Sequence, residues 1–226
     1  MKFLIMGYDD PIEFGHGDNT QLVIEDTKLY THIVQLLNAI INEKYKTNEI
    51  EILEDKSDKD ILSKAILIIN PFQLDLNAKP IIKALYEEVS KILIDDGDQF
   101  LQYKEYITDI NKIVLDIIEE FNVDFSFDDD LPLEGYLKAI NLKITKDPEE
   151  PIFDTLLNYI ELISELTPKT PLIICNCLIY FTKHEIDELC KYMNYKCMNV
   201  LFIENHCNEL IPDCHQYIID DDLCMI

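Results

Sequence analysis

The sequence predicts an α/β protein whose central, mostly parallel sheet is interrupted by a helical domain. Short β-branched and aliphatic runs alternate with segments of helical periodicity near both ends of the chain, as in sheets covered by helices. The middle of the chain, from Pro80 to Phe121, shows helical periodicity alone. We therefore expect a discontinuous α/β head domain, residues 1–78 and 141–226, and an α-helical leg domain, residues 79–140.

The elements of the N-terminal part follow from short apolar runs and their flanking residues. Strands are expected at residues 2–6, 21–24, 49–53 and 65–69, and the last is nearly all apolar, as in strands buried on both faces. Apolar residues then recur at helical spacing after Asp26 and Thr27, either of which is a suitable N-cap. A helix is therefore expected to continue to about Tyr45.

The remaining elements are two helical segments around a polar break, followed by a return of strands. Helices are expected at residues 81–93, 100–121, 133–140, 151–163 and 182–192, and strands at 142–145, 171–177, 199–203 and 216–219. The first two helices form an antiparallel hairpin or a long kinked pair. Thr182 and Glu185 have the spacing of a capping box, Thr-x-x-Glu, at the start of the last helix.

The charge of the chain limits its partners. There are 44 acidic residues and 19 basic ones, giving a net charge of −25, and every basic residue is a lysine. This charge argues against broad attraction to nucleic acid or to an anionic membrane. Without arginine, which supplies most bidentate contacts to guanine, any nucleic-acid contact would follow the backbone and ignore sequence. A bias toward AT-rich codons explains the composition equally well.

The cysteines and the apolar runs indicate the compartment. All seven cysteines follow residue 174, and their odd number argues against a secreted disulfide framework. No signal peptide is recognised, and no apolar run approaches the length that spans a bilayer. We therefore expect a soluble cytoplasmic protein.

An α/β sheet of the expected kind could serve nucleotide binding or metal-dependent cleavage. Neither Gly-x-x-x-x-Gly-Lys-Ser/Thr nor Gly-x-Gly-x-x-Gly occurs, so no nucleotide is expected. The strands that end in Glu25 and Glu204 are faintly similar to the metal-side strand of phosphate-loop ATPases. A metal-dependent nuclease would use acids near strand ends, here Asp9, Asp10, Glu25 and Asp26. No motif supports it, and it remains an alternative.

Soft metal ligands gather near the C-terminus without the spacing of a zinc site. His206-Cys207 and Cys214-His215 place paired ligands next to each other, whereas zinc sites usually leave two to four residues between paired ligands. Buried or idle thiols are the favoured interpretation there. Cys175 and Cys177 lie on an expected strand, where their side chains would share one face, and they are expected to pack in the core.

The most distinctive stretch is residues 122–134. It contains five carboxylates, Asp124, Asp128, Asp129, Asp130 and Glu134. Close carboxylates repel one another, so they either spread in water or surround a hard cation such as Ca²⁺. An EF-hand loop starting at Asp124 would need glycine at its sixth position, where Asp129 stands. A less regular calcium site and a solvated loop pinned to the helices by Phe125 and Phe127 both remain open.

Several stretches together resemble the Csn2 family of type II-A CRISPR systems. The matching features are Asp10-Pro11-Ile12, residues 22–26, Ile33-Val34-Gln35, the acidic run leading into Leu137-Lys138, residues 172–183, residues 200–204 and residues 217–220. The resemblance runs from end to end and lies in the order and spacing of weak motifs. It implies a head similar to a degenerate P-loop ATPase domain without nucleotide binding, plus a helical leg.

The resemblance also implies a function without catalytic activity. Family members form calcium-stabilised, ring-shaped homotetramers that bind linear double-stranded DNA by its ends and act in spacer acquisition with Cas1, Cas2 and Cas9. By position, Asp124, Asp128, Asp129, Asp130 and Glu134 match the calcium-binding segment. Lys56, Lys59 and Lys64 match a lysine-bearing segment that could face the DNA. A scaffold of the adaptation complex with no DNA contact of its own is a further alternative.

Overall fold

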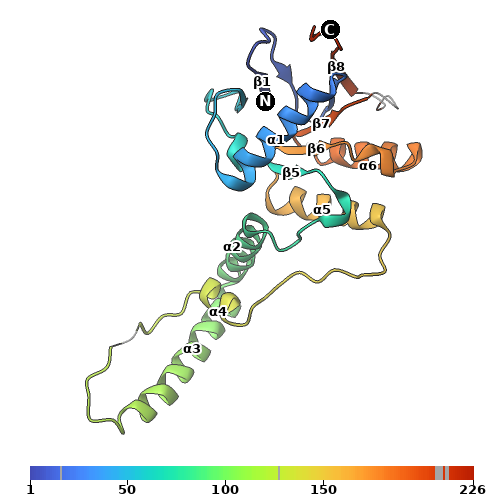
Figure 1. Cartoon of the computed structure of the whole chain (residues 1–226). Coiled ribbons are helices and arrows are strands. Elements are labelled where there is room, and N and C mark those ends of the chain that lie inside the picture. Colours follow the sequence, from blue (N-terminus) through green and yellow to red (C-terminus); the bar gives the residue numbers. More distant parts are fainter. Residues whose placement is uncertain (16, 127, 207–210, 212–213) are drawn as a thin grey trace. The chain divides into compact units, whose positions relative to one another are not determined.

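A computed structural model describes residues 1–15, 17–126, 128–206, 211 and 214–226. The chain divides into two compact units, drawn in Figure 1. Unit 1 consists of Met1–Leu74 and Pro148–Ile226, and unit 2 of Asp75–Asp147. The predicted leg domain, residues 79–140, falls within the second of these units.

Unit 1 contains a parallel sheet that joins strands from both ends of the chain. Its strands are β3 (Asn19–Ile24), β5 (Ile66–Ile68), β6 (Leu172–Cys175), β7 (Val200–Glu204) and β8 (Cys214–Ile219), in the order β5-β6-β7-β3-β8. Every neighbouring pair is parallel. The prediction of an α/β fold with a mostly parallel sheet is therefore confirmed.

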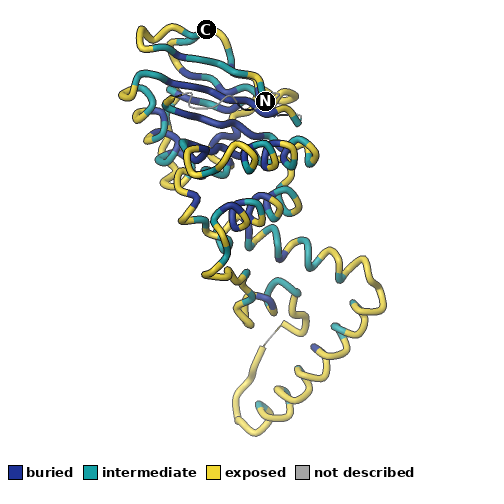
Figure 2. Tube along the Cα trace, turned by 90° about the vertical axis from the view of Figure 1, so that its right-hand side faces the viewer, coloured by how far each residue is buried: buried dark blue, intermediate teal, exposed yellow. Residues whose placement is uncertain are grey.

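Helices cover both faces of this sheet. Helix α1 (Thr27–Glu43) packs on the face that carries Leu22, Leu201 and Ile203. Its N-cap is Asp26, whose carboxylate accepts the backbone N–H of Leu29 at 2.6 Å. The other face lies toward α5 (Ile152–Leu166) and α6 (Lys183–Tyr195). Figure 2 shows the buried residues concentrated in the strands and on the inner sides of these helices.

A second, antiparallel sheet lies beside α1. It consists of β1 (Lys2–Ile5), β2 (Ile12–Glu13) and β4 (Ile50–Leu53) in the order β2-β1-β4. The strands at residues 2–6 and 49–53 were predicted, but β2 was not. Two residues are too few to show an alternating pattern, and the pairing partner of such a short strand is fixed by the core it covers.

Two predicted strands need correction. Residues 142–145 are not a strand: the Asn77 side chain donates to the Ile144 carbonyl and accepts from its N–H, both at 2.9 Å. The Asn77 side-chain amide thus makes the hydrogen bonds to Ile144 that a neighbouring strand would otherwise make. Strand β5, predicted to be buried on both faces, is an edge strand whose first two residues, Ile66 and Leu67, are only half-buried.

Unit 2 is helical. Helix α2 (Lys79–Asp95) is followed by α3 (Gly97–Ile118), and the two meet at a sharp bend (Figure 2). Asp96 lies between them and caps α3 by accepting the N–H of Gln99 at 3.1 Å. The short helix α4 (Leu133–Ala139) packs on α2 and buries Leu137. Among the described helices, none is both long and apolar enough to span a membrane.

Three single-turn helices complete the structure. They are η1 (Leu62–Lys64), η2 (Pro71–Gln73) and η3 (Leu178–Tyr180), all in unit 1.

The capping box predicted at the start of α6 is present, because Thr182 and Glu185 accept each other's backbone N–H groups. The side-chain hydrogen bonds of Thr182 and Glu185 therefore start α6 at the position that the sequence predicts.

Candidate functional site

The place where ATPases bind phosphate is closed in this sheet. Strand β3 ends at Ile24, and α1 begins at Thr27. Only two residues connect them, so no room remains for a phosphate-binding loop. The Asp26 carboxylate already takes an N-terminal amide of α1, and the Asn205 side chain donates to the Ile24 carbonyl at 2.8 Å. Both the negative charge and the closed connection oppose a triphosphate at this edge.

The strand-end acids do not gather into a metal centre in the described part of the chain. Asp26 serves as a helix cap, and Glu204 is buried, with only 3% of its surface exposed. No group of three or more His, Cys, Asp or Glu residues lies close enough to hold a metal ion, within the residues that the structure describes. Cys207, one of the four ligands weighed for zinc, lies outside the described residues.

Cys175 and Cys177 are both fully buried, in agreement with core packing. They do not share one strand face as expected, because β6 ends at Cys175 and the next residue, Asn176, adopts a left-handed φ of 48°. The Asn176 side chain accepts the N–H of Asn205 at 2.9 Å, which ties the ends of β6 and β7 together. This turn places Cys177 at the start of η3.

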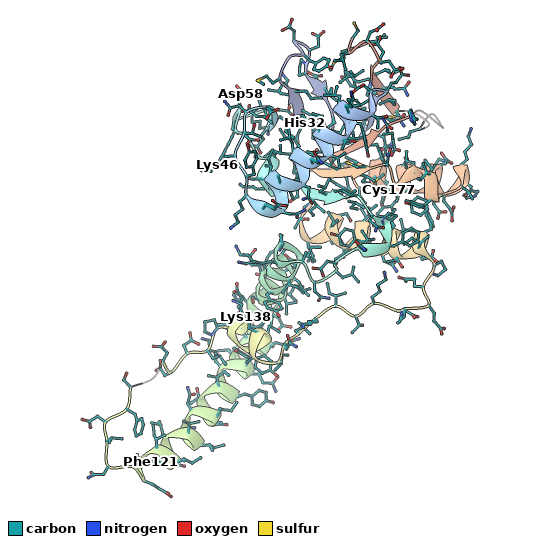
Figure 3. The ribbon with its side chains drawn as sticks, in the orientation of Figure 1. His32, Lys46, Asp58, Phe121, Lys138 and Cys177 are labelled. Carbon is teal, nitrogen blue, oxygen red and sulfur yellow. The ribbon has the colours of Figure 1, made fainter. Side chains whose placement is uncertain are left out.

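The acidic segment, residues 122–134, runs from the end of α3 into the first turn of α4. Its residues before α4 are irregular and exposed, and Phe127 lies outside the described residues. The segment returns along α3, whose Asn111 side chain donates to the Asp129 carbonyl and whose Tyr103 hydroxyl donates to the Leu131 carbonyl, both at 2.8 Å. Figure 3 shows its two ends, near Phe121 and near Lys138.

The predicted calcium ligands have separate partners or none in the described part of this unit. Asp130 forms an ion pair with Lys104 of α3, and Glu134 pairs with Lys138 one turn later at 3.0 Å. Asp124, Asp128 and Asp129 form no ion pair with any described residue. The Phe125 ring makes an edge-to-face contact with Phe121 just after α3, with 6.2 Å between ring centroids.

These positions do not fit a calcium ion within a single chain. Calcium takes six to eight oxygen ligands at about 2.3–2.6 Å, whereas the described carboxylates do not converge. Two of the five instead offset lysine charges. A calcium site at this segment would require the two lysine pairs to open, or oxygen ligands from another chain.

The predicted DNA-contacting lysines lie together in unit 1. Lys56 and Lys59 belong to the turn after β4, and Lys64 ends η1; all three are exposed. The turn is closed by a hydrogen bond from the Glu54 N–H to the Lys59 carbonyl at 3.1 Å. None of the three lysines forms an ion pair with a residue that the structure describes.

Two acids of the same turn are engaged by the fold. Asp55 pairs with the N-terminal amino group at 3.0 Å. Asp60 accepts the backbone N–H groups of Ile52 and Leu62 at 3.2 and 3.0 Å. Two further acids of the turn, Glu54 and Asp58, are exposed, so acidic and basic side chains alternate there.

Two further lysines lie near this turn and were not predicted. Lys44 and Lys46 line a pocket of about 470 Å³ together with Asp60 and Ser63, the residue before Lys64. They follow α1 and precede β4, so a strand separates them from the turn in sequence. In Figure 3, Lys46 and Asp58 lie on the same side of unit 1. Five lysines, Lys44, Lys46, Lys56, Lys59 and Lys64, therefore form what we call the lysine cluster.

Comparison with known proteins gives consistent matches across the chain. The sequence profile of the CRISPR-associated protein family Cas_Csn2 matches residues 22–223. A CRISPR-associated protein Csn2 of Streptococcus agalactiae is 26% identical over 226 residues, covering 96% of this chain and 94% of that protein. A protein of the same name from Enterococcus faecalis is 22% identical, covering 95% and 93%.

A solved structure shares the fold. It is the crystal structure of Stu0660 of Streptococcus thermophilus, which superimposes with a TM-score of 0.57 at 17% sequence identity. The match covers 92% of this chain and 70% of that one. At this level of identity the similarity supports the fold, and it does not assign a role to any residue of this chain.

Proposed function

The chain belongs to the Cas_Csn2 family of CRISPR-associated proteins, and from that premise we propose that it acts in the acquisition of new spacers. In this proposal it binds the ends of double-stranded DNA without sequence preference, as a calcium-dependent ring of four chains, and catalyses no reaction. The observation that carries the proposal is the family match over residues 22–223.

Self-association is supported by the exposed apolar side chains of α3. Ile110, Ile113 and Ile117 are 54%, 61% and 57% exposed, and their spacing of three and four residues places them on one side of the helix. Apolar residues in such a row usually mark a surface that is covered in an assembly. A helix of this kind is suited to pack against the same helix of another copy.

DNA contact is proposed for the lysine cluster. Five ammonium groups on one side of an acidic protein give a local positive surface, and four copies in a ring would multiply it fourfold. Lysine acts as a point charge on phosphate, so binding would ignore sequence and weaken strongly with salt. Encircling a duplex also requires a free end, so linear DNA is expected to bind and covalently closed circles are not.

Calcium is proposed to act at the acidic segment within the assembly. Because the described carboxylates of one chain do not converge, calcium would have to replace the Lys104 and Lys138 pairs or use oxygens from a second chain. A positive ion there would also reduce repulsion between neighbouring acidic chains. The ligands would come from Asp124, Asp128, Asp129, Asp130 and Glu134.

The central experiment incubates the full chain with labelled linear duplex and with the same sequence as a closed circle, with calcium and with chelator. We expect a shift of the linear DNA in calcium, no shift of the circle and no cleavage of either. Cleavage would favour the nuclease that uses strand-end acids. Neither shift nor cleavage, from a protein shown to be assembled, would favour the scaffold without DNA contact.

Paired substitutions separate the two parts of the proposal. Lys56→Glu with Lys59→Glu should reduce DNA binding at least tenfold and leave the number of chains in the assembly unchanged. Asp128→Asn with Asp129→Asn should weaken assembly in calcium and leave the folded monomer intact. Lys183→Glu, at the start of α6, is a control for the reversal of one lysine charge away from the cluster. Unaltered DNA binding by the first pair would move the contact elsewhere, and normal assembly by the second would favour a solvated loop.

A further inference from the structure

A pocket of about 290 Å³ opens in unit 1 between the parallel sheet and the turn that leads into α6. Its walls combine apolar side chains with three polar or ionisable ones. The lining residues are Gln21, Leu178, Ile179, Phe181, Ile186, Glu204 and His206. Its volume is close to the lower end of the range for ligand pockets, roughly 300–1,000 Å³. It is therefore large enough for one side chain or a small molecule.

Glu204 is the charged group of this pocket. It is the last residue of β7, and the strand register pairs Val23 with Glu204 and Gln21 with Phe202. Alternate residues of paired strands share a face, so Gln21 and Glu204 lie on the same side of the sheet. Glu204 is 97% buried, and its Oε1 atom has no hydrogen-bond partner among the residues that the structure describes. An orphaned carboxylate oxygen of this kind is costly.

The free protein lowers that cost by holding a proton. Burial raises the pKa of Glu204 to about 8, against the opposing effect of the Leu178 and Cys177 backbone N–H groups. The other titratable groups that face it are Cys175, Cys177 and Tyr30, whose pKa values burial raises further above neutrality, and His206 at the pocket wall. No cationic side chain of the described chain lines the pocket.

Exposed apolar side chains continue from the wall of the pocket. Ile179 lines it and is 59% exposed. The next residue, Tyr180, is 47% exposed and forms an edge-to-face contact with Phe72, 55% exposed, with 5.1 Å between ring centroids. An apolar patch beside a buried acid has the anatomy of a protein–protein contact, in which a charged side chain is anchored within a dry surround.

We propose that this pocket receives an arginine side chain of a partner protein, whose guanidinium binds the free Oε1 of Glu204 while neighbouring apolar residues of the partner cover Ile179, Tyr180 and Phe72. A guanidinium fits because its planar fork of donors suits the carboxyl group of Glu204, whereas the Gln21 side-chain oxygen already accepts a hydrogen bond from the Gln216 side chain at 3.2 Å. The occupant is another protein, because this chain contains no arginine. The inference does not depend on DNA binding, calcium or ring formation.

The probe is N-acetylarginine amide, added to the full chain with ¹³C-labelled Ile and Leu methyl groups and followed by NMR. We expect saturable shifts of the Leu178, Ile179 and Ile186 methyl signals in the millimolar range. N-acetylcitrulline amide has nearly the same shape and no charge, and we expect it to bind at least tenfold more weakly. Equal binding of the two probes, or no shift with either, would overturn the proposal.

Two substitutions test the roles of Glu204 and of Ile179, the exposed residue that lines the pocket. Glu204→Gln should weaken arginine binding at least tenfold, while Glu188→Gln, on the exposed side of α6, should leave it unchanged. Ile179→Lys changes an exposed residue, so the fold is retained, and places an ammonium group at the pocket that should block the probe. Retained binding in either pocket variant would overturn the assignment, and tighter binding of N-acetyllysine amide would assign the site to lysine instead.

The pH dependence distinguishes a bound cation from mere filling of an apolar cavity. A cation that pairs with Glu204 must displace its proton, so the affinity should rise as the pH increases and level off above the pKa of about 8. Binding should be on the order of tenfold tighter at pH 8.5 than at pH 6.5. An affinity that does not change over this range would contradict pairing with the carboxylate.

Discussion

The two units of this chain treat their apolar side chains in opposite ways. Unit 1 buries most of them, and Phe3, Leu37 and Leu201 have no exposed surface, while the patch of Phe72, Ile179 and Tyr180 stays exposed. Unit 2 leaves them in solvent along α3, where Ile113 and Ile117 are more than half exposed. Unit 1 is therefore a finished α/β core. Unit 2 has a row of exposed apolar side chains on α3, which is typical of a surface that another molecule covers.

The difference teaches that helical periodicity alone does not locate a core. Residues 100–121 have a regular apolar pattern, and α3 forms as predicted over Gly97–Ile118. Yet Ile107 is the only buried residue of this helix within the described chain. The pattern predicted the helix and its apolar side, and the proposed function assigns the covering of that side to another copy of the chain.

The largest effect is expected from removing the exposed row of α3. The triple change Ile110→Ser, Ile113→Ser and Ile117→Ser should abolish self-association, because the contact would lose its apolar area. Sedimentation velocity in calcium measures this directly, with Tyr195→Ser, 83% exposed on α6, as the control. A triple variant that assembles like the parent would show that this side of α3 is not the interface.

The next effect compares one core leucine with one α3 isoleucine. Leu201→Ala in β7 should lower the free energy of unfolding by about 2–5 kcal/mol, because it leaves a cavity in a close-packed interior. Ile113→Ala should change it by less than about 0.5 kcal/mol in the unassembled chain. Urea unfolding in chelator at low protein concentration tests both. Similar losses for the two variants would erase the distinction between the units.

A smaller effect concerns pH. Glu204 has its pKa raised from 4.5 to about 8 by burial, so the folded chain binds a proton that the unfolded chain has released. Its contribution to stability is present below pH 4.5 and is lost as the pH rises toward 8, by roughly 1.4 kcal/mol per pH unit. Glu204→Gln removes this loss, so its stability relative to the parent should increase between pH 5.5 and 7.5. A constant difference would contradict the raised pKa.

The smallest effect is expected at a helix end of unit 1. Thr182→Ala removes the hydroxyl that accepts the Glu185 N–H at the start of α6, and loss of such a cap costs about 1 kcal/mol. The amides of the first turn of α6 should exchange faster with deuterium, while those of α3 stay unchanged. Faster exchange in both helices would mean that the two units unfold together.

Much of the fold could be predicted because local patterns match local structure. The strand–helix alternation, Asp26 as the cap of α1 and the capping box of α6 rest on nearby residues. The antiparallel pairing of β1, β2 and β4 depends on partners far apart in sequence. So does the replacement of a strand at 142–145 by hydrogen bonds from Asn77, which no run of residues could reveal.

The candidate sites were less accessible to sequence reasoning for the same reason. The acidic segment was recognised by its composition, but the lysine pairs of Asp130 and Glu134 separate its charges in the folded chain. Lys56, Lys59 and Lys64 were found by resemblance, whereas Lys44 and Lys46 join them only through the fold. Glu204 is a strand-end acid in the sequence, and only the structure shows that it lines a pocket and that its buried Oε1 has no described hydrogen-bond partner.

The most direct test of the account is the mass of the intact assembly in calcium and in chelator, measured by native mass spectrometry on the unmodified chain. The account predicts four copies in calcium, through the exposed side of α3 and the acidic segment, and dissociation when calcium is removed. A single chain of 26.5 kDa under both conditions would contradict it.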